Sequence, residues 1–150
     1  MIRDQINNML KTALKAQEKR KVSTLRLINA AIKDRDIAVR TSDREGVSDA
    51  EILEILAKMI KQRRESIQTY EEAGRLELAQ QEQEEIDVIT LFLPKQLTDN
   101  EIKAAVKQVI SEINAQGLRD MGRIMGTLKE RYMGQMDFSK ASQIVKSEFA

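Results

Sequence analysis

One stretch decides how this chain of 150 residues is organised: Phe92-Leu93-Pro94-Lys95-Gln96-Leu97-Thr98-Asp99-Asn100-Glu101. Pro94 is the only proline; it has no N–H to give to a helix, and its ring biases Leu93 away from helical angles. Thr98 and Glu101 then form a capping-box pattern, in which each side chain accepts a hydrogen bond from the backbone N–H of the other residue. One helix therefore ends before Pro94 and another begins near Thr98. We expect a domain boundary here, between residues 1–93 and residues 94–150.

Apolar residues on both sides of this boundary recur with the period of an α-helix. The pattern predicts four helices before the boundary, at about residues 2–14, 19–39, 48–74 and 75–91, and three after it, at about 98–116, 120–132 and 137–149. Leu14 and Leu76 are expected to face inward, and the polar residues 40–46 to form a loop. Ser48 and Glu51 repeat the capping-box pattern at the start of the third helix, Gly74 is expected to end that helix, and Asp137 to cap the last one. No window alternates with a period of two for long enough to indicate a strand. The prediction is an all-α, multihelical fold with a four-helix N-terminal part and a three-helix C-terminal part.

The residue types that are missing exclude several classes of site. There is no Cys and no His, which excludes disulfides, thiolate and imidazole catalysis, and the usual zinc and iron ligands. There is no Trp, and no glycine-rich phosphate loop follows a strand. The longest apolar run, Val88–Leu93, is far shorter than the ~20 residues of a membrane span, and the first residues show no apolar signal segment. We expect no metal, no cofactor, no contact with a membrane and a cytoplasmic location.

The charges are nearly balanced overall, at 25 basic and 24 acidic side chains, but they are unevenly distributed. Residues 1–46 carry a net charge of +5, residues 47–93 carry −6 and residues 94–150 carry +2. Either the basic first pair of helices packs against the acidic second pair, or it offers a basic face to an anionic ligand. The acidic run at 82–87 is typical of a solvated helix face, and Arg63 and Arg64 are expected to pair with glutamates of the same chain.

Two groups of cations are candidates for contacts with phosphate. The first is Lys19-Arg20-Lys21, at the start of the second predicted helix. Lysine and arginine supply most backbone contacts to nucleic acid; alternatively, these residues keep a helix end soluble and favour the C-terminal dipole of the preceding helix. The second group lies within the segment Arg119-Asp120-Met121-Gly122-Arg123-Ile124-Met125-Gly126.

Gly122 and Gly126 lie four residues apart, so that one stands above the other on one helix face. Each costs a helix roughly 0.5–1 kcal/mol relative to alanine, and a close approach of another backbone is expected to compensate. The approaching backbone is either a neighbouring helix of the C-terminal part or an RNA strand whose phosphates meet Arg119 and Arg123. In the second case the RNA would be recognised by shape and phosphates rather than by its bases.

Several stretches along the chain resemble the YqeY family: Leu25–Lys33, Arg64–Ile67, Tyr70–Ala79, Phe92–Leu97 and Asp120–Gly126, followed by Asp137 and Val145-Lys146. The resemblance covers essentially the whole chain in the right order. That family is similar to the helical tail of the B subunit of the tRNA-dependent aspartyl/glutamyl amidotransferase, the part that engages tRNA. The resemblance implies an all-helical protein with two subdomains. It also brings the label of a carbon–nitrogen ligase with glutamine as amido-N-donor, for which this sequence offers no catalytic residues.

The resemblance matches Gly122 and Gly126 to two glycines of the tail motif, with Arg123 between them and with Lys129 and Arg131 extending a basic edge. The leading hypothesis is a noncatalytic accessory protein that binds tRNA or tRNA-like structured RNA. Its candidate contacts are Arg119, Gly122, Arg123, Gly126, Lys129 and Arg131, with Lys19, Arg20 and Lys21 as a second patch. The alternatives are a helix-bundle adaptor for a protein partner and an amidotransferase-related enzyme in its own right. The sequence leaves the oligomeric state open.

Overall fold

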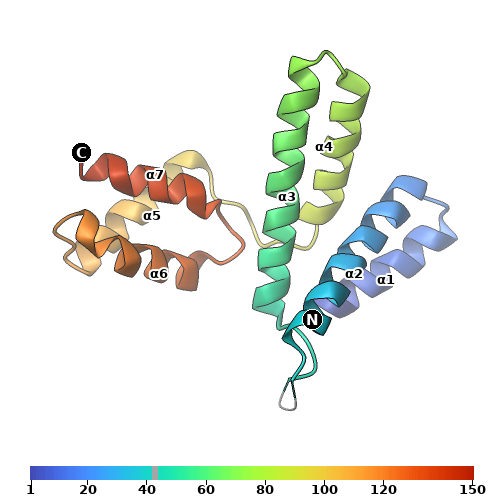
Figure 1. The fold of residues 1–150 in the computed structure, drawn as a ribbon, viewed down its shortest axis with the longest axis horizontal. Helices are drawn as coiled ribbons and strands as arrows, with labels where there is room; N and C mark the ends of the chain where they lie inside the picture. The colour runs from blue at the N-terminus through green and yellow to red at the C-terminus, as the bar shows by residue number, and fades with distance from the viewer. Residues whose placement is uncertain (42–43) are drawn as a thin grey trace. The chain divides into compact units, whose positions relative to one another are not determined.

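The chain is an all-α protein in the computed structural model, which describes residues 1–41 and 44–150. These residues form seven α-helices and one short 3₁₀ helix, and none of them belongs to a β-strand. The predicted all-α, multihelical fold is therefore confirmed. The predicted loop at 40–46 includes Ser42 and Asp43, which lie outside the described residues. The chain divides into two compact units, residues 1–93 (unit 1) and residues 94–150 (unit 2), which can be followed by colour in Figure 1.

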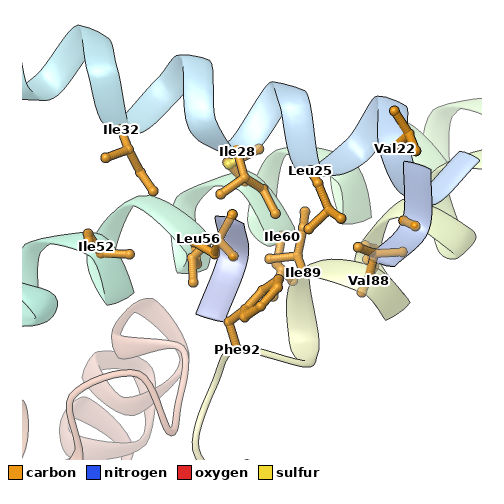
Figure 2. Packing of buried hydrophobic residues seen from close by; sticks show 14 residues of the cluster. Val22, Leu25, Ile28, Ile32, Ile52, Leu56, Ile60, Val88, Ile89 and Phe92 are labelled. Carbon is orange, nitrogen blue, oxygen red and sulfur yellow. The ribbon is translucent and has the colours of Figure 1, made fainter. Parts of the chain in front are cut away.

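Unit 1 contains two helical hairpins: α1 (Ile2–Lys15) pairs with α2 (Lys19–Val39), and α3 (Asp49–Glu72) pairs with α4 (Leu76–Thr90) (Figure 1). The hairpins meet because α2 also packs against α3 and α4. Figure 2 shows the apolar stripe of α2 facing the stripes of α3 and α4. The buried side chains that meet there are Val22, Leu25, Ile28, Ile32, Ile52, Leu56, Ile60, Val88, Ile89 and Phe92. Each large apolar side chain buried in this way contributes about 1.5–3 kcal/mol, which offsets the entropy lost on ordering four helices.

Both ends of α3 agree with the sequence signals. Ser48 Oγ accepts a hydrogen bond from the Glu51 N–H, and the Glu51 carboxylate accepts one from the Ser48 N–H, each at 3.3 Å. The predicted capping box is therefore confirmed. Gly74 follows α3 with a φ of 72°, and the Arg75 N–H donates to the Tyr70 carbonyl at 2.8 Å. This is the bond that defines a Schellman motif, so the predicted glycine cap is also confirmed.

A cluster of polar contacts, here called the Asp36 clasp, ties α1 and α2 to the residues before α3. Arg3 Nη1 and Nη2 donate to the two carboxylate oxygens of Asp36, each at 2.9 Å. Asp36 Oδ1 also accepts from the Val47 N–H at 2.9 Å. The hydrogen bond from Arg3 is the main reason that the pKa of the Asp36 carboxyl lies below its usual value. Gly46 passes so close that a Cβ there would lie 2.7 Å from Asp36 Oδ1, so the clasp leaves no room for a side chain at this position.

Unit 2 contains α5 (Asp99–Glu112), α6 (Met121–Tyr132) and α7 (Phe138–Glu148), with the 3₁₀ helix η1 (Leu118–Asp120) directly before α6. Each α-helix packs against the other two (Figure 1). The capping box predicted at Thr98 is present, and Asp137 Oδ1 accepts from the Ser139 N–H at 2.9 Å as the predicted cap of α7. The helices enclose a core formed by Ile102, Ala105, Val106, Val109, Ile124, Leu128, Met136, Ala141 and Val145.

Two positions in unit 1 differ from the prediction, and a third has an unusual backbone conformation. Leu14 and Leu76, which were predicted to face inward, are 46% and 65% exposed. Leu76 is the first residue of α4, and this end of α4 forms the tip of the α3–α4 hairpin (Figure 1). Gln17 follows α1 with a φ of 57°, a conformation that glycine adopts at lower cost. Periodicity gives the direction of a side chain, but not how far its packing partner extends.

Candidate nucleic-acid interface

Gly122, Gly126 and Lys129, here called the glycine face, lie on the side of α6 that is turned away from the core of unit 2. Ile124 and Leu128 are fully buried, whereas the residues of the glycine face follow one another at spacings of four and three on the opposite side of the helix. Both glycines are exposed, and a Cβ on either would meet nothing within 4 Å. The interpretation in which a neighbouring helix of the C-terminal part packs on this strip is therefore wrong. The glycines leave an open, smooth stretch of helix surface.

Three cations lie near the glycines in sequence, and they differ in whether a carboxylate or carbonyl group of the chain binds them. Arg119 in η1 and Lys129 in α6 are exposed, and neither forms an ion pair with any residue that the structure describes. Arg123 Nη1 lies 3.6 Å from Asp120 Oδ1, and Arg123 Nη2 donates to the Ile113 carbonyl at 3.4 Å. Its side chain is nevertheless 64% exposed. Arg119 and Lys129 are thus free to meet an anion, and Arg123 is partly neutralised.

Asp120 is the residue of this segment that the sequence reasoning missed. Besides its ion pair with Arg123, its Oδ2 accepts a hydrogen bond from the Gln116 N–H at 2.9 Å. It therefore orders the turn before α6 and lowers the positive charge near the glycine face. The sequence already indicated the ion pair between Asp120 and Arg123, because residues three apart at the start of a helix face each other.

Arg131 lies on a different side of α6 from the glycine face. Nine residues separate it from Gly122, which is about two and a half helical turns. Its Nη2 lies 2.6 Å from Glu112 Oε2 on α5. The hydrogen bond between them raises the pKa of Arg131 and lowers the pKa of Glu112. Arg131 is therefore engaged within unit 2 rather than placed beside the glycines.

The second group of cations, Lys19-Arg20-Lys21, belongs to the first turn of α2 in unit 1. Arg20 Nε lies 3.2 Å from Glu84 Oε2 of α4, and Lys21 Nζ lies 3.7 Å from Glu18 Oε2. Lys19 is exposed and has no ion pair in the described part of the chain. The contact between Arg20 and Glu84 joins the basic first pair of helices to the acidic second pair. This agrees with the interpretation that the two pairs attract each other.

One ion pair between α3 and α4 of unit 1 is largely buried. Arg63 Nε lies 2.9 Å from Glu85 Oε2, and both side chains are only 14% exposed, which confirms that Arg63 pairs with a glutamate of the chain. Arg64 forms no such pair with the residues described. Burial raises the pKa of Glu82 nearby. Among residues 1–41 and 44–150 no cluster of three or more Asp or Glu side chains could hold a metal ion, and no helix is long and apolar enough to cross a membrane.

Comparison with known proteins yields one family and several relatives. A family model described as Yqey-like protein matches residues 3–149. An uncharacterized protein of Schizosaccharomyces pombe is 30% identical over 90 residues, which cover 60% of this chain and 70% of that protein. Two relatives are named altered inheritance of mitochondria protein 41, mitochondrial. The one from Pyrenophora tritici-repentis is 28% identical over 142 residues, covering 91% of this chain and 76% of the relative. The one from Clavispora lusitaniae is 30% identical over 108 residues, covering 71% and 61%.

These names correct one expectation and confirm another. Two relatives are named as mitochondrial proteins, so the expectation of a cytoplasmic location is wrong. That expectation rested on the lack of cysteine and of a long apolar run. Proteins of more than one aqueous compartment share these features, so they do not identify the compartment. The resemblance seen in the motifs is confirmed by a match that includes residues of both units. The chain belongs to the Yqey-like protein family.

Proposed function

We propose that this chain is a noncatalytic accessory protein that binds tRNA or tRNA-like structured RNA through the glycine face of α6. The observation that carries the proposal is the open backbone at Gly122 and Gly126, where a Cβ would meet nothing within 4 Å. The two glycines together cost the helix roughly 1–2 kcal/mol relative to alanine, and the described residues make no use of the space they leave. An RNA backbone that approaches this face would use it, with the unpaired Arg119 and Lys129 beside its phosphates.

The chemistry around the glycine face suits phosphates rather than bases. Arginine and lysine supply most of the contacts that proteins make to nucleic-acid backbones. The first turn of α6 contains Gly122, and the N-terminus of a helix adds the positive end of its dipole. The segment 119–129 contains no aromatic residue, so stacking on bases is not expected from it. Recognition would follow the shape and charge of a folded RNA.

The affinity is expected to be modest. The chain has a net charge of only +1, and the acidic helices α3 and α4 repel RNA. Counterion release would supply most of the binding energy, so binding should weaken steeply as salt rises. Removal of three cations from the interface is expected to reduce the slope of log K against log salt by about 2–3.

The test is a titration of the full chain into a deacylated tRNA pool at low and at physiological salt. One variant changes Arg119, Arg123 and Lys129 to alanine. A control variant removes the same charge elsewhere in unit 2, at three exposed lysines that form no ion pair with the described residues: Lys103, Lys107 and Lys146.

Loss of binding in the first variant, with binding kept in the control, would support the proposed site. Equal losses in both variants would mean that net charge alone matters and that α6 has no special role. If the unmodified chain binds no tRNA even at low salt, the proposal is wrong.

A further inference from the structure

The outer side of the α1–α2 hairpin carries cations from both helices. The two helices lie side by side (Figure 1), and an exposed hydrogen bond aligns them, in which Asn29 Nδ2 donates to Asn7 Oδ1 at 3.3 Å. On α1, Lys11 follows Asn7 by one turn. On α2, Arg26 lies three residues before Asn29 and Lys33 lies four residues after it. Residues at these spacings share a helix face, so the three cations lie around the asparagine pair.

Two more cations, Lys15 and Lys19, continue this surface towards the turn between the helices. Lys15 follows Lys11 by four residues and Lys19 precedes Arg26 by seven, so each shares a helix face with that neighbour. The five side chains, here called the basic face, are all exposed, and none forms an ion pair with a residue that the structure describes. The basic face is therefore open to an anion from outside unit 1.

Few carboxylates of the hairpin oppose this charge. Residues 1–40 contain four acidic side chains. Glu18 and Asp36 are paired with cations of the same hairpin, at 3.7 Å and 2.9 Å. The other two, Asp4 and Asp34, lie in the half of the hairpin that is away from its turn. The half nearer the turn is therefore strongly positive.

The spacing of the cations suits an extended anion. Lys19, Arg26 and Lys33 are seven residues apart, which places one cation about every 10.5 Å along about 21 Å of helix. A nucleic-acid duplex offers phosphates over such a length, and lysine and arginine are their usual partners. Residues 1–46 contain no aromatic side chain. This surface therefore offers no ring to stack on unpaired bases, and no aromatic anchor of the kind found at membrane interfaces.

The asparagine pair favours RNA over DNA. The bond between the two side chains uses one N–H of Asn29 and the side-chain oxygen of Asn7, which leaves the NH₂ group of Asn7 and the side-chain oxygen of Asn29 for other partners. A 2′-hydroxyl is both a donor and an acceptor, and it is the group that distinguishes RNA from DNA. Double-helical RNA displays its 2′-hydroxyls in a wide, shallow minor groove bordered by phosphates. The amides of this surface lie between cations in the same way.

We propose that the basic face binds the backbone of a double-helical RNA stem. The cations lie at phosphates, and Asn7 and Asn29 lie at 2′-hydroxyls of the minor groove. The inference rests on the proposed function for the class of ligand and deepens it, because it names the part of a folded RNA that unit 1 contacts. It uses no residue of α6.

The test measures binding of the full chain over a salt series to a blunt RNA duplex of about 16 base pairs. The DNA duplex of the same sequence, the single RNA strand and phosphatidylserine vesicles are measured in parallel. The basic-face variant changes Lys11, Arg26 and Lys33 to alanine, and the control is the variant described above that removes three exposed lysines of unit 2. The changed side chains are exposed, so each variant is expected to fold, which circular dichroism checks.

The basic-face variant should bind the RNA duplex at least roughly tenfold more weakly than the control, and its slope of log K against log salt should be reduced by about 2–3. A third variant, Asn7→Ala with Asn29→Ala, tests the amides. It should reduce the preference for the RNA duplex over the DNA duplex and leave the slope unchanged, because no cation is lost.

The outcomes separate this inference from the site on α6. If the basic-face variant binds the RNA duplex as well as the control does, while removal of Arg119, Arg123 and Lys129 abolishes binding, this inference is wrong and the proposed function stands. The reverse pattern would support the basic face and contradict the site on α6. A chain that prefers the single strand, or that binds the DNA duplex as tightly as the RNA duplex, would overturn the inference. Binding to the vesicles without binding to the RNA duplex would also overturn it.

Discussion

The open backbone of α6 leads to a prediction in which stability and binding move in opposite directions. In Gly126→Ala the new methyl group would meet nothing within 4 Å, so it introduces no clash. Alanine inside a helix is more stable than glycine by about 0.5–1 kcal/mol, because glycine loses more conformational freedom on folding. Gly122 is the second residue of α6, and its gain should lie at the lower end of this range. We expect the double variant, Gly122→Ala with Gly126→Ala, to raise the free energy of unfolding by about 1–1.5 kcal/mol.

Hydrogen exchange of the α6 amides in the full chain measures this gain locally. Where an amide exchanges only when the helix unfolds, the expected rise in the free energy of unfolding slows its exchange by roughly five- to tenfold. Ala104, which is exposed within α5, provides the opposite control, since Ala104→Gly should cost about 0.5–1 kcal/mol. If the double variant exchanges as fast as the unmodified chain or faster while the control behaves as expected, the face is not open and the reasoning is refuted.

The same double variant is expected to bind tRNA more weakly, because two methyl groups hold an RNA backbone away from α6. No cation is lost, so the slope of log K against log salt should stay unchanged. The slope therefore distinguishes the effect of the glycines from that of Arg119, Arg123 and Lys129, because removal of those cations lowers it. Unchanged affinity in the double variant would remove the glycines from the interface.

Four further predictions concern unit 1. Gly46→Ala should lower the free energy of unfolding by about 1–3 kcal/mol, measured in urea, because its Cβ would lie 2.7 Å from Asp36 Oδ1. The folded pKa of Asp36 is lowered from an ordinary value of 3.8, so its stabilising contribution is present above that pH and is lost as the pH falls through the folded pKa; a pH series of urea curves should show this loss in the unmodified chain and not in Asp36→Asn. Gln17→Gly should be more stable than Gln17→Ala, by up to about 1 kcal/mol in thermal unfolding, because φ is positive there. Arg63→Met should lower the free energy of unfolding by about 1–3 kcal/mol, because it leaves Glu85 largely buried without a cation. In a double-mutant cycle, adding Glu85→Leu should restore most of that free energy.

Helix ends were the part of the fold that the sequence predicted best. The caps at Ser48, Thr98 and Asp137 and the glycine end at Gly74 each depend on residues only a few positions away. The exposure of Leu76 depends instead on how far another helix extends, which no local pattern states. The clasp around Asp36 was also missed, because it joins residues that are 33 positions apart.

The candidate site also combines features that the sequence predicted with features that it did not. The spacing of Gly122 and Gly126 showed that they share a helix face, but only the fold shows that this face is open. Arg131 and Arg20 looked available in the sequence, and both have carboxylates beside them that come from other helices. The same reasoning predicted a glutamate partner for Arg63, which has one, and for Arg64, which has none among the residues described. The charge of a segment can thus be read locally, whereas the pairing of a given cation cannot.

The pairing of consecutive helices in unit 1 has a consequence for how the chain is made. Helices α1 and α2 are complete when residue 39 has been added, but the apolar stripe of α2 is fully covered only when α3 and α4 have both formed, near residue 90. At a synthesis rate of roughly 5–20 residues per second, this interval lasts roughly 3–10 s, whereas two adjacent helices pair in microseconds to milliseconds. The nascent α1–α2 hairpin therefore waits with one apolar stripe uncovered. A chaperone that binds apolar helices would meet this protein, during its synthesis, at α2.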